Sequence, residues 1–212
     1  MLKRTALLFT DLTARPGTAI GTLLSEDARS GPVLLLFAAY AAVSALVSRL
    51  MPAGFVPELP PETFGRPYAL YLSVSLSAGL LLNVLAAAAL PWAEAFFSAG
   101  RIGPRVLLAI AGLGVYFLSF AAAAGRPAAA ALLAAAPAAL FLGLLVRRPG
   151  FPVCFRIMLA LSAPGLALAP VEFLGIAAGS KPVYEAAMLA AALWSLWLLT
   201  LALRARGCPG TA

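Results

Sequence analysis

Histidine is absent from this chain, and cysteine occurs only twice, at Cys154 and Cys208. The lack of histidine excludes histidine-based catalytic triads, histidine general bases, and haem or zinc sites that use an imidazole ligand. Two isolated thiols with no C-x-x-C pair cannot build a disulfide framework or a thiol redox motif. These absences remove much of the usual active-site chemistry.

Other signatures of catalysis are missing as well. The sequence has no phosphate-binding glycine loop, no metal-ligand spacing, and no serine or cysteine nucleophile with a candidate base. Aspartate is absent from every segment that is apolar enough to span a membrane. We therefore expect a protein that is not an enzyme, with no catalytic residues, no metal site and no cofactor.

Charge is scarce: only 11% of the residues are charged, against about 25% in a soluble domain. With 63% hydrophobic residues and a mean hydropathy of +0.98, the chain is predicted to be an integral membrane protein with the lipid bilayer as its first partner. The net charge of +7 is spread over the loops rather than clustered, so no nucleic-acid partner is expected.

The apolar runs predict an all-α, polytopic transmembrane bundle over residues 31–204, followed by a short cytoplasmic tail at 205–212. Prolines, glycines and charges punctuate about six spans, with five also possible, at roughly 32–50, 69–91, 104–123, 127–146, 152–174 and 183–203. A single re-entrant hairpin over 104–146 would leave the orientation of the other spans unchanged. Pro91, Trp92 and Glu94 are expected to mark the far end of the second span.

The basic residues are distributed unevenly between the two sides of this arrangement. Eleven of the 15 fall on one side, namely Lys3, Arg4, Arg15, Arg29, Arg101, Arg105, Arg147, Arg148, Arg156, Arg204 and Arg206. Because loops rich in Lys and Arg stay cytoplasmic, both termini are predicted to be cytoplasmic. We expect a bacterial inner (plasma) membrane as the location.

Residues 1–30 form the only long segment of mixed polarity. Pro16 is expected to end one short amphipathic helix and to begin another, because proline suits a first helical turn. Such helices usually lie in the membrane interface, although a solvated tail with one helical turn is the alternative. The candidate partner-contact residues of this segment are Pro16, Ile20, Leu23 and Leu24.

The stretch from Phe151 to Gly179 combines span-like apolarity with helix-disturbing residues. Pro164 and Pro170 each remove a backbone donor, and Gly165 follows the first of them. In lipid, the backbone groups that are freed must find partners on neighbouring helices or in water. We therefore predict a broken helix inside the bundle, with either a packed partner helix or a cavity at the Pro164-Gly165 break.

Three charged residues lie near this stretch: Arg156, Glu172 and Glu185. Arg156 and Glu172 are sixteen residues, about 24 Å, apart on a helix and are not expected to pair. Arg156 is predicted to snorkel to cytoplasmic headgroups. Glu172 and Glu185 are predicted to form an outer interfacial charge cluster with Lys181. The alternative is a carboxylate pair that couples to protons or cations.

Asn83 is a polar residue near the middle of the second span. An amide without a partner at that depth is costly, so Asn83 should face another helix and form an interhelical hydrogen bond. A substrate-lining role is the alternative. In the fourth span, Ala130, Ala134, Ala138 and Gly143 form a small-residue ridge that suits internal packing or self-association.

Two stretches resemble the Yip-domain family of membrane proteins, the Ypt/Rab-interacting type, in its bacterial branch. The first is T-A-R-P-G-T-A-I-G-T-L-L-S-E-D-A-R-S-G-P-V-L-L-L-F-A-A-Y-A-A-V-S-A-L, a proline-started amphipathic helix that leads into a span. The second is F-R-I-M-L-A-L-S-A-P-G-L-A-L-A-P-V-E-F-L-G, followed later by A-A-L-W-S-L-W-L-L-T-L-A-L-R. The resemblance implies a compact helical bundle, usually of five spans, with a cytoplasmic N-terminus and a role in membrane organisation or partner binding.

Two functional hypotheses follow from the sequence. The first is a non-enzymatic scaffold or partner-binding subunit that contacts other membrane proteins, or a second copy, through the N-terminal segment. The second is a small transporter or channel subunit that uses Asn83, Glu172 and Glu185.

Overall fold

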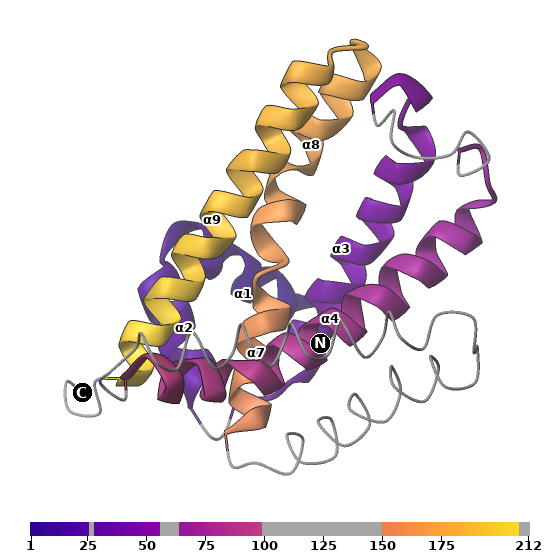
Figure 1. Cartoon of the computed structure of the whole chain (residues 1–212). Helices are drawn as coiled ribbons and strands as arrows, with labels where there is room; N and C mark the ends of the chain where they lie inside the picture. Colours follow the sequence, from indigo (N-terminus) through magenta and orange to yellow (C-terminus); the bar gives the residue numbers. More distant parts are fainter. Residues whose placement is uncertain (26–27, 56–63, 99–149, 208–212) are drawn as a thin grey trace, which may run out of the picture. The chain divides into compact units, whose positions relative to one another are not determined.

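The computed structural model describes residues 1–25, 28–55, 64–98 and 150–207 (Figure 1). All regular secondary structure in these ranges is helical, as the sequence predicts. Four of the described segments are long and apolar enough to cross a membrane, namely Gly31–Leu50, Tyr68–Pro91, Phe151–Ala177 and Lys181–Arg206. They indicate a membrane protein. The predicted spans at 104–123 and 127–146, and the small-residue ridge within the latter, lie outside the described residues.

The chain divides into two compact units. The first comprises Met1–Val84 and Phe155–Ala212, and the second is Leu85–Cys154. The second unit is described only at residues 85–98 and 150–154, which are helical apart from the turn at Gly150. The packing, the cavity and the contacts reported below belong to the first unit.

Two short helices, α1 (Leu2–Ala14) and α2 (Pro16–Leu24), begin the chain. The proline separates them as predicted, because a residue without an N–H fits the first turn of α2 but not the interior of α1. Their apolar faces are buried, with Leu12, Ile20 and Leu23 each less than 5% exposed. Helix α1 packs on α3 and α2 packs on α9, so this segment is part of the folded unit.

Helices α3 (Gly31–Leu50) and α4 (Tyr68–Ser98) follow, with a short 3₁₀ turn, η1 (Ala53–Phe55), after α3. The Tyr68 hydroxyl donates a hydrogen bond of 3.0 Å to the Ala42 carbonyl and ties the start of α4 to α3. Helix α4 continues through Pro91 to Ser98, but its span-like apolar part is Tyr68–Pro91. The predicted end of the span at Pro91 is therefore confirmed, although the helix does not end there. A proline can stay inside a membrane helix when the freed carbonyl finds another partner.

The stretch predicted as one broken span is two helices, α7 (Phe151–Ala160) and α8 (Ala163–Ala177). Pro164 lies in the first turn of α8, where its missing N–H removes no helical bond. Pro170 lies inside α8 without ending it. The predicted break is therefore present, and it is caused by Pro164 rather than by Pro170.

A tight turn joins α8 to α9 (Lys181–Gly207), and the two helices lie side by side (Figure 1). The Ser180 N–H donates to the Gly175 carbonyl at 2.8 Å and the Gly179 N–H donates to the Ile176 carbonyl at 3.0 Å. Gly179 has φ +63°, which completes a Schellman cap. A Cβ on Gly175 would lie 2.8 Å from the Tyr184 nitrogen, so a glycine there permits close packing.

The buried clusters fix the directions of the helices. Val33, Leu36 and Phe37, near the start of α3, pack with residues 159–163 at the α7–α8 junction. Near the end of α3, Val43 and Val47 pack with Phe173 and Ile176 of α8. Helix α3 therefore runs parallel to α7–α8, and α9 runs back antiparallel to both.

Candidate functional site

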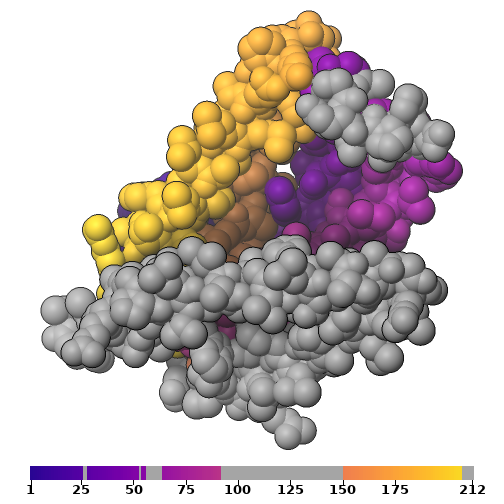
Figure 2. Space-filling view, viewed as in Figure 1, coloured from indigo at the N-terminus to yellow at the C-terminus, as the bar shows by residue number. Residues whose placement is uncertain are grey.

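A cavity of about 490 Å³ lies between α3, α4, α7, α8 and α9. This volume falls within the roughly 300–1,000 Å³ of small-molecule pockets. The space-filling surface is hollowed between the orange-to-yellow α8–α9 hairpin and the purple α3 and α4 (Figure 2). Its polar lining residues come from four helices and the α7–α8 junction: Tyr40, Ser44, Ser75, Asn83, Ser162, Glu172 and Ser195.

Glu172 supplies a carboxylate to the cavity wall. The side chain is half-buried, and among the described residues it makes no ion pair and no hydrogen bond. Tyr40 and Tyr184 lie close enough for its charge to act on both hydroxyls. Tyr184 is itself held by Phe55, with ring centroids 5.7 Å apart. A half-buried carboxylate among aromatic groups, with no described cation beside it, is a site that favours a positively charged group.

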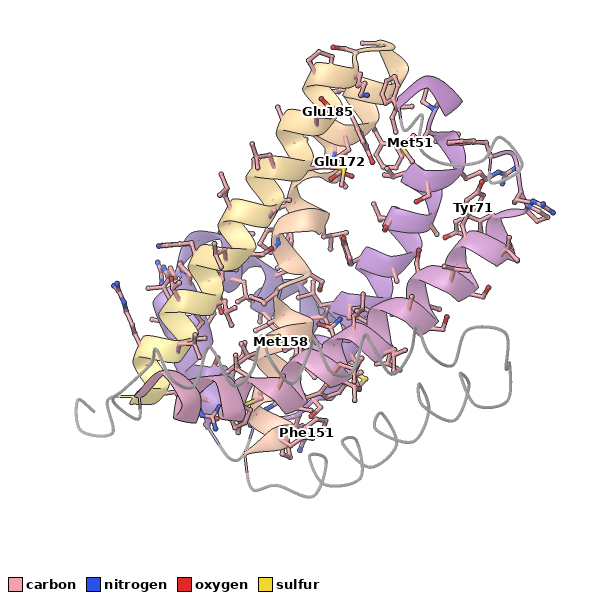
Figure 3. All side chains as sticks on the ribbon, viewed as in Figure 1. Met51, Tyr71, Phe151, Met158, Glu172 and Glu185 are labelled. Atoms are coloured by element: carbon pink, nitrogen blue, oxygen red, sulfur yellow. The ribbon has the colours of Figure 1, made fainter. Side chains whose placement is uncertain are left out.

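Glu185 does not join this site. It is exposed on α9 and lies 3.5 Å from the Lys181 ammonium, one turn earlier on the same helix. Glu172 and Glu185 lie near the α8–α9 turn, whereas Met158 lies toward the other end of the bundle (Figure 3). Lys181 and Glu185 therefore form the ion pair expected of the charge cluster, but the prediction that Glu172 joins them is wrong, because α8 directs that residue to the cavity.

Asn83 lines the same cavity as Glu172. Its amide nitrogen donates a 2.8 Å hydrogen bond to the Gly79 carbonyl, one turn earlier in α4. The predicted interhelical bond is not present among the described residues, because the side chain satisfies its donor within its own helix. The structure places Asn83 in the cavity wall, and a substrate-lining role stays a prediction.

Gly165 brings α8 and α3 together beside the cavity. A Cβ at this position would lie 2.5 Å from Cε2 of Tyr40. The absence of a side chain therefore lets the Tyr40 ring lie directly against the α8 backbone. The Ser44 side chain, one turn later on α3, lies close enough to act on the Tyr40 hydroxyl. The sequence predicts a break at Gly165 but not this ring, since nothing in the local pattern names the partner.

Ser195 satisfies a backbone group that the α7–α8 break sets free. Its hydroxyl donates to the Leu161 carbonyl at 3.1 Å and lies 2.8 Å from the Ala191 carbonyl of its own helix. The Ser162 hydroxyl donates to the Leu159 carbonyl at 2.6 Å. A neighbouring helix thus supplies a partner for the broken helix, as predicted. Sequence reasoning missed Ser195 itself, and its only local signal is a hydroxyl in the middle of the apolar run 186–199.

Arg156 is buried, with 3% of its surface exposed. Its guanidinium donates to the Ser25 carbonyl at 2.9 Å and also to the Ala28 carbonyl. The Nε atom has no hydrogen-bond partner among the described residues. The expected snorkelling to headgroups is therefore wrong, because the carbonyls beyond the end of α2 lack helical donors and attract the guanidinium instead. Arg156 and Glu172 do not pair, as predicted.

The predicted partner-contact residues lie largely against the chain itself. Ile20 and Leu23 are buried, whereas Pro16 and Leu24 are partly exposed. Leu23 belongs to the same apolar cluster as Val33 and Leu159. This face of α2 is used for internal packing in the structure.

The described residues contain no group of three or more acidic, cysteine or histidine side chains that could hold a metal ion. Comparisons of the chain with protein-family models, curated proteins and solved structures find no match. The resemblance to the Yip-domain family therefore stays a prediction from the two stretches that carry it.

Proposed function

We propose that this chain is a small transporter or channel subunit that binds a polar solute in the cavity between its helices. The observation that carries the proposal is that Glu172 of α8 and Asn83 of α4 line one cavity. An ionisable side chain within a membrane span is expensive, and it usually marks a substrate or ion pathway. The size of the cavity and its mixture of apolar walls with a few polar groups are typical of binding sites for small molecules.

The cavity also favours a solute over a protein scaffold as the basis of function. The scaffold hypothesis needs the apolar face of α2 for a partner, and Ile20 and Leu23 on that face are buried in the structure. The finer architecture belongs to the same proposal: six spans in a bacterial inner membrane, with both termini cytoplasmic. The bias of the basic residues supports that orientation.

Water access to the cavity is the first requirement of this function. In a cysteine-free background made by Cys154→Ala and Cys208→Ser, we would compare Ser44→Cys with Leu46→Cys in proteoliposomes. Ser44 lines the cavity, whereas Leu46, two residues later on α3, is 39% exposed on the apolar outside. A membrane-impermeant charged thiol reagent should label Ser44→Cys at least about tenfold faster, since thiol reaction requires access to the thiolate. Equal labelling rates would contradict a solvated cavity.

Solute flux is the second requirement. Proteoliposomes containing the wild-type chain should take up at least one member of a panel of small polar solutes. Glu172→Gln and Asn83→Leu should each abolish that uptake, because each removes a polar group of the cavity wall. Glu185→Gln serves as the matched control, since Glu185 is exposed and paired with Lys181. Absence of flux in the wild type for every solute tested would contradict the proposal.

A further inference from the structure

The charge and the walls of the cavity identify the class of its occupant. We infer that the cavity binds a small organic monocation, an ammonium group that carries an apolar body. This inference rests on the proposed function and adds the chemistry of the solute.

The charge of the cavity favours a cation. Among the described residues that line it, Glu172 is the sole charged side chain. No described Lys or Arg forms an ion pair with it. A nearby positive charge or hydrogen-bond donors stabilise an ionised carboxylate that is partly shielded from water. A bound cation would supply that positive charge.

The remaining polar groups do not form a metal site. A hard metal ion takes about six or more oxygen ligands. The cavity supplies a single carboxylate, and the described residues contain no group of three or more acidic, cysteine or histidine side chains that could hold a metal ion. One carboxylate with scattered hydroxyls suits an ammonium group, which needs far fewer contacts than a bare metal ion.

The walls suit the rest of an organic cation. The Tyr40 ring lies against α8 at Gly165, and Glu172 lies seven residues, about 10 Å, further along the same helix. Tyrosine rings attract cations through the ring face. Phe37, Leu82 and Met188 give the cavity apolar surface, and methionine adapts to irregular shapes. The ammonium group is therefore assigned to the Glu172 end of the cavity, and the apolar body to the level of Phe37.

The test uses the purified full-length protein in detergent, with choline, tetramethylammonium and n-butylammonium as probes. The comparison compounds are 3,3-dimethylbutan-1-ol, the neutral isostere of choline, and sodium chloride at matched ionic strength. Calorimetry should detect binding of at least one organic cation. Affinity should fall about tenfold or more in Glu172→Gln and stay unchanged in Glu185→Gln.

Tyr40→Phe, which keeps the ring, should bind better than Tyr40→Leu, which removes it. The thermal midpoint of each variant without ligand shows whether it is folded, and Glu172→Asp provides a second variant that keeps the charge.

Three results would overturn the inference: no organic cation in the panel binds, the neutral isostere binds as tightly as choline, or Glu172→Gln binds as tightly as the wild type. Each of them leaves the cysteine-labelling result untouched. A water-accessible cavity without cation binding would therefore refute the ligand class alone. Equal labelling of Ser44→Cys and Leu46→Cys would refute the proposed function itself.

Discussion

Single residues set the width of the cavity and its charge. Gly165 provides the close approach of Tyr40 to α8, and Glu172 provides the carboxylate. The two lie on one helix, so the α7–α8 break that starts α8 also determines where both face. A change at either position should therefore act on the cavity without removing a span.

Gly165→Ala should destabilise the folded protein. The new Cβ would be 2.5 Å from Cε2 of Tyr40, and both the ring and the backbone would have to shift. Overpacking of this kind costs about 1–3 kcal/mol, against which the helical gain of alanine over glycine is at most about 1 kcal/mol. The measurement is the free energy of unfolding of the purified protein in mixed micelles.

Gly21→Ala is the matched control for that substitution. Gly21 lies in α2, and a Cβ there would meet nothing within 4 Å. This control should leave the free energy of unfolding unchanged or raise it slightly. Gly165→Ala being equally neutral would show that Tyr40 does not rest against the α8 backbone.

What the sequence predicts at this scale is local chemistry, not pairing. The helix break at Pro164 and the unusual position of Glu172 are visible in the sequence, because proline and charge are informative on their own. The contacts of Gly165 with Tyr40 and of Arg156 with Ser25 join residues far apart in the chain. In a single sequence, helices that are apolar over most of their surface do not show which of them meet, so these contacts could not be predicted.

At the scale of elements, two connections hold the unit together at points where helical hydrogen bonding is interrupted. Ser195 of α9 donates to a carbonyl at the α7–α8 break, and Arg156 of α7 donates to carbonyls beyond the end of α2. In both cases a side chain from one helix donates to a backbone carbonyl just beyond the end of another helix.

Ser195→Ala should weaken the packing of α9 on the broken helix. Interhelical hydrogen bonds in membranes contribute about 0.6–2 kcal/mol, and the Leu161 carbonyl would lose its described partner. Ser73→Ala is the control, because the Ser73 hydroxyl is exposed and bonds only within α4. The free energy of unfolding should fall for Ser195→Ala and stay within about 0.5 kcal/mol for Ser73→Ala. Equal losses would argue against a role for Ser195 at the break.

Arg156→Met should release α1 and α2 from the bundle. The substitution keeps an apolar stem but leaves the Ala28 carbonyl without its described donor and the Ser25 carbonyl with only the Ala28 N–H. A polar group that stays unsatisfied costs about 1–3 kcal/mol. Hydrogen exchange should accelerate over residues 2–24 while α9 stays protected. Arg49→Met, at an exposed position, should leave hydrogen exchange unchanged both over residues 2–24 and in α9. Faster exchange in all helices at once would show that Arg156 supports the whole unit rather than this segment.

At the scale of the whole molecule, apolar length and charge bias are the properties that the sequence predicts best. The four described spans lie within about four residues of their predicted boundaries, apart from the extension of α4 to Ser98. That extension could not be read from Pro91, because proline ends a helix only when its freed carbonyl finds no other partner. The predicted orientation follows from loop charges alone and needs an independent test.

Both termini should lie on the same, cytoplasmic side of the membrane. Helix α3 runs parallel to α7–α8, and α9 returns, so the N-terminal helices and the end of α9 share one end of the described unit. The basic residues at that end include Arg29, Arg204 and Arg206, whereas the opposite end has Arg49, Arg66 and Lys181. Cytoplasmic loops carry the excess of basic residues.

Reporter fusions can decide this orientation. A green fluorescent protein fused before Met1 or after residue 207 should fluoresce, and alkaline phosphatase inserted at residues 178–180 should be active outside the cytoplasm. Reversed reporter activities at all three sites would mean that the orientation is opposite to the predicted one, with an even number of membrane crossings. Termini on opposite sides would require an odd number, which is the five-span architecture that the Yip-domain resemblance implies, and would contradict six spans. Whether the two terminal fusions lie on the same side of the membrane or on opposite sides therefore decides between six spans and five.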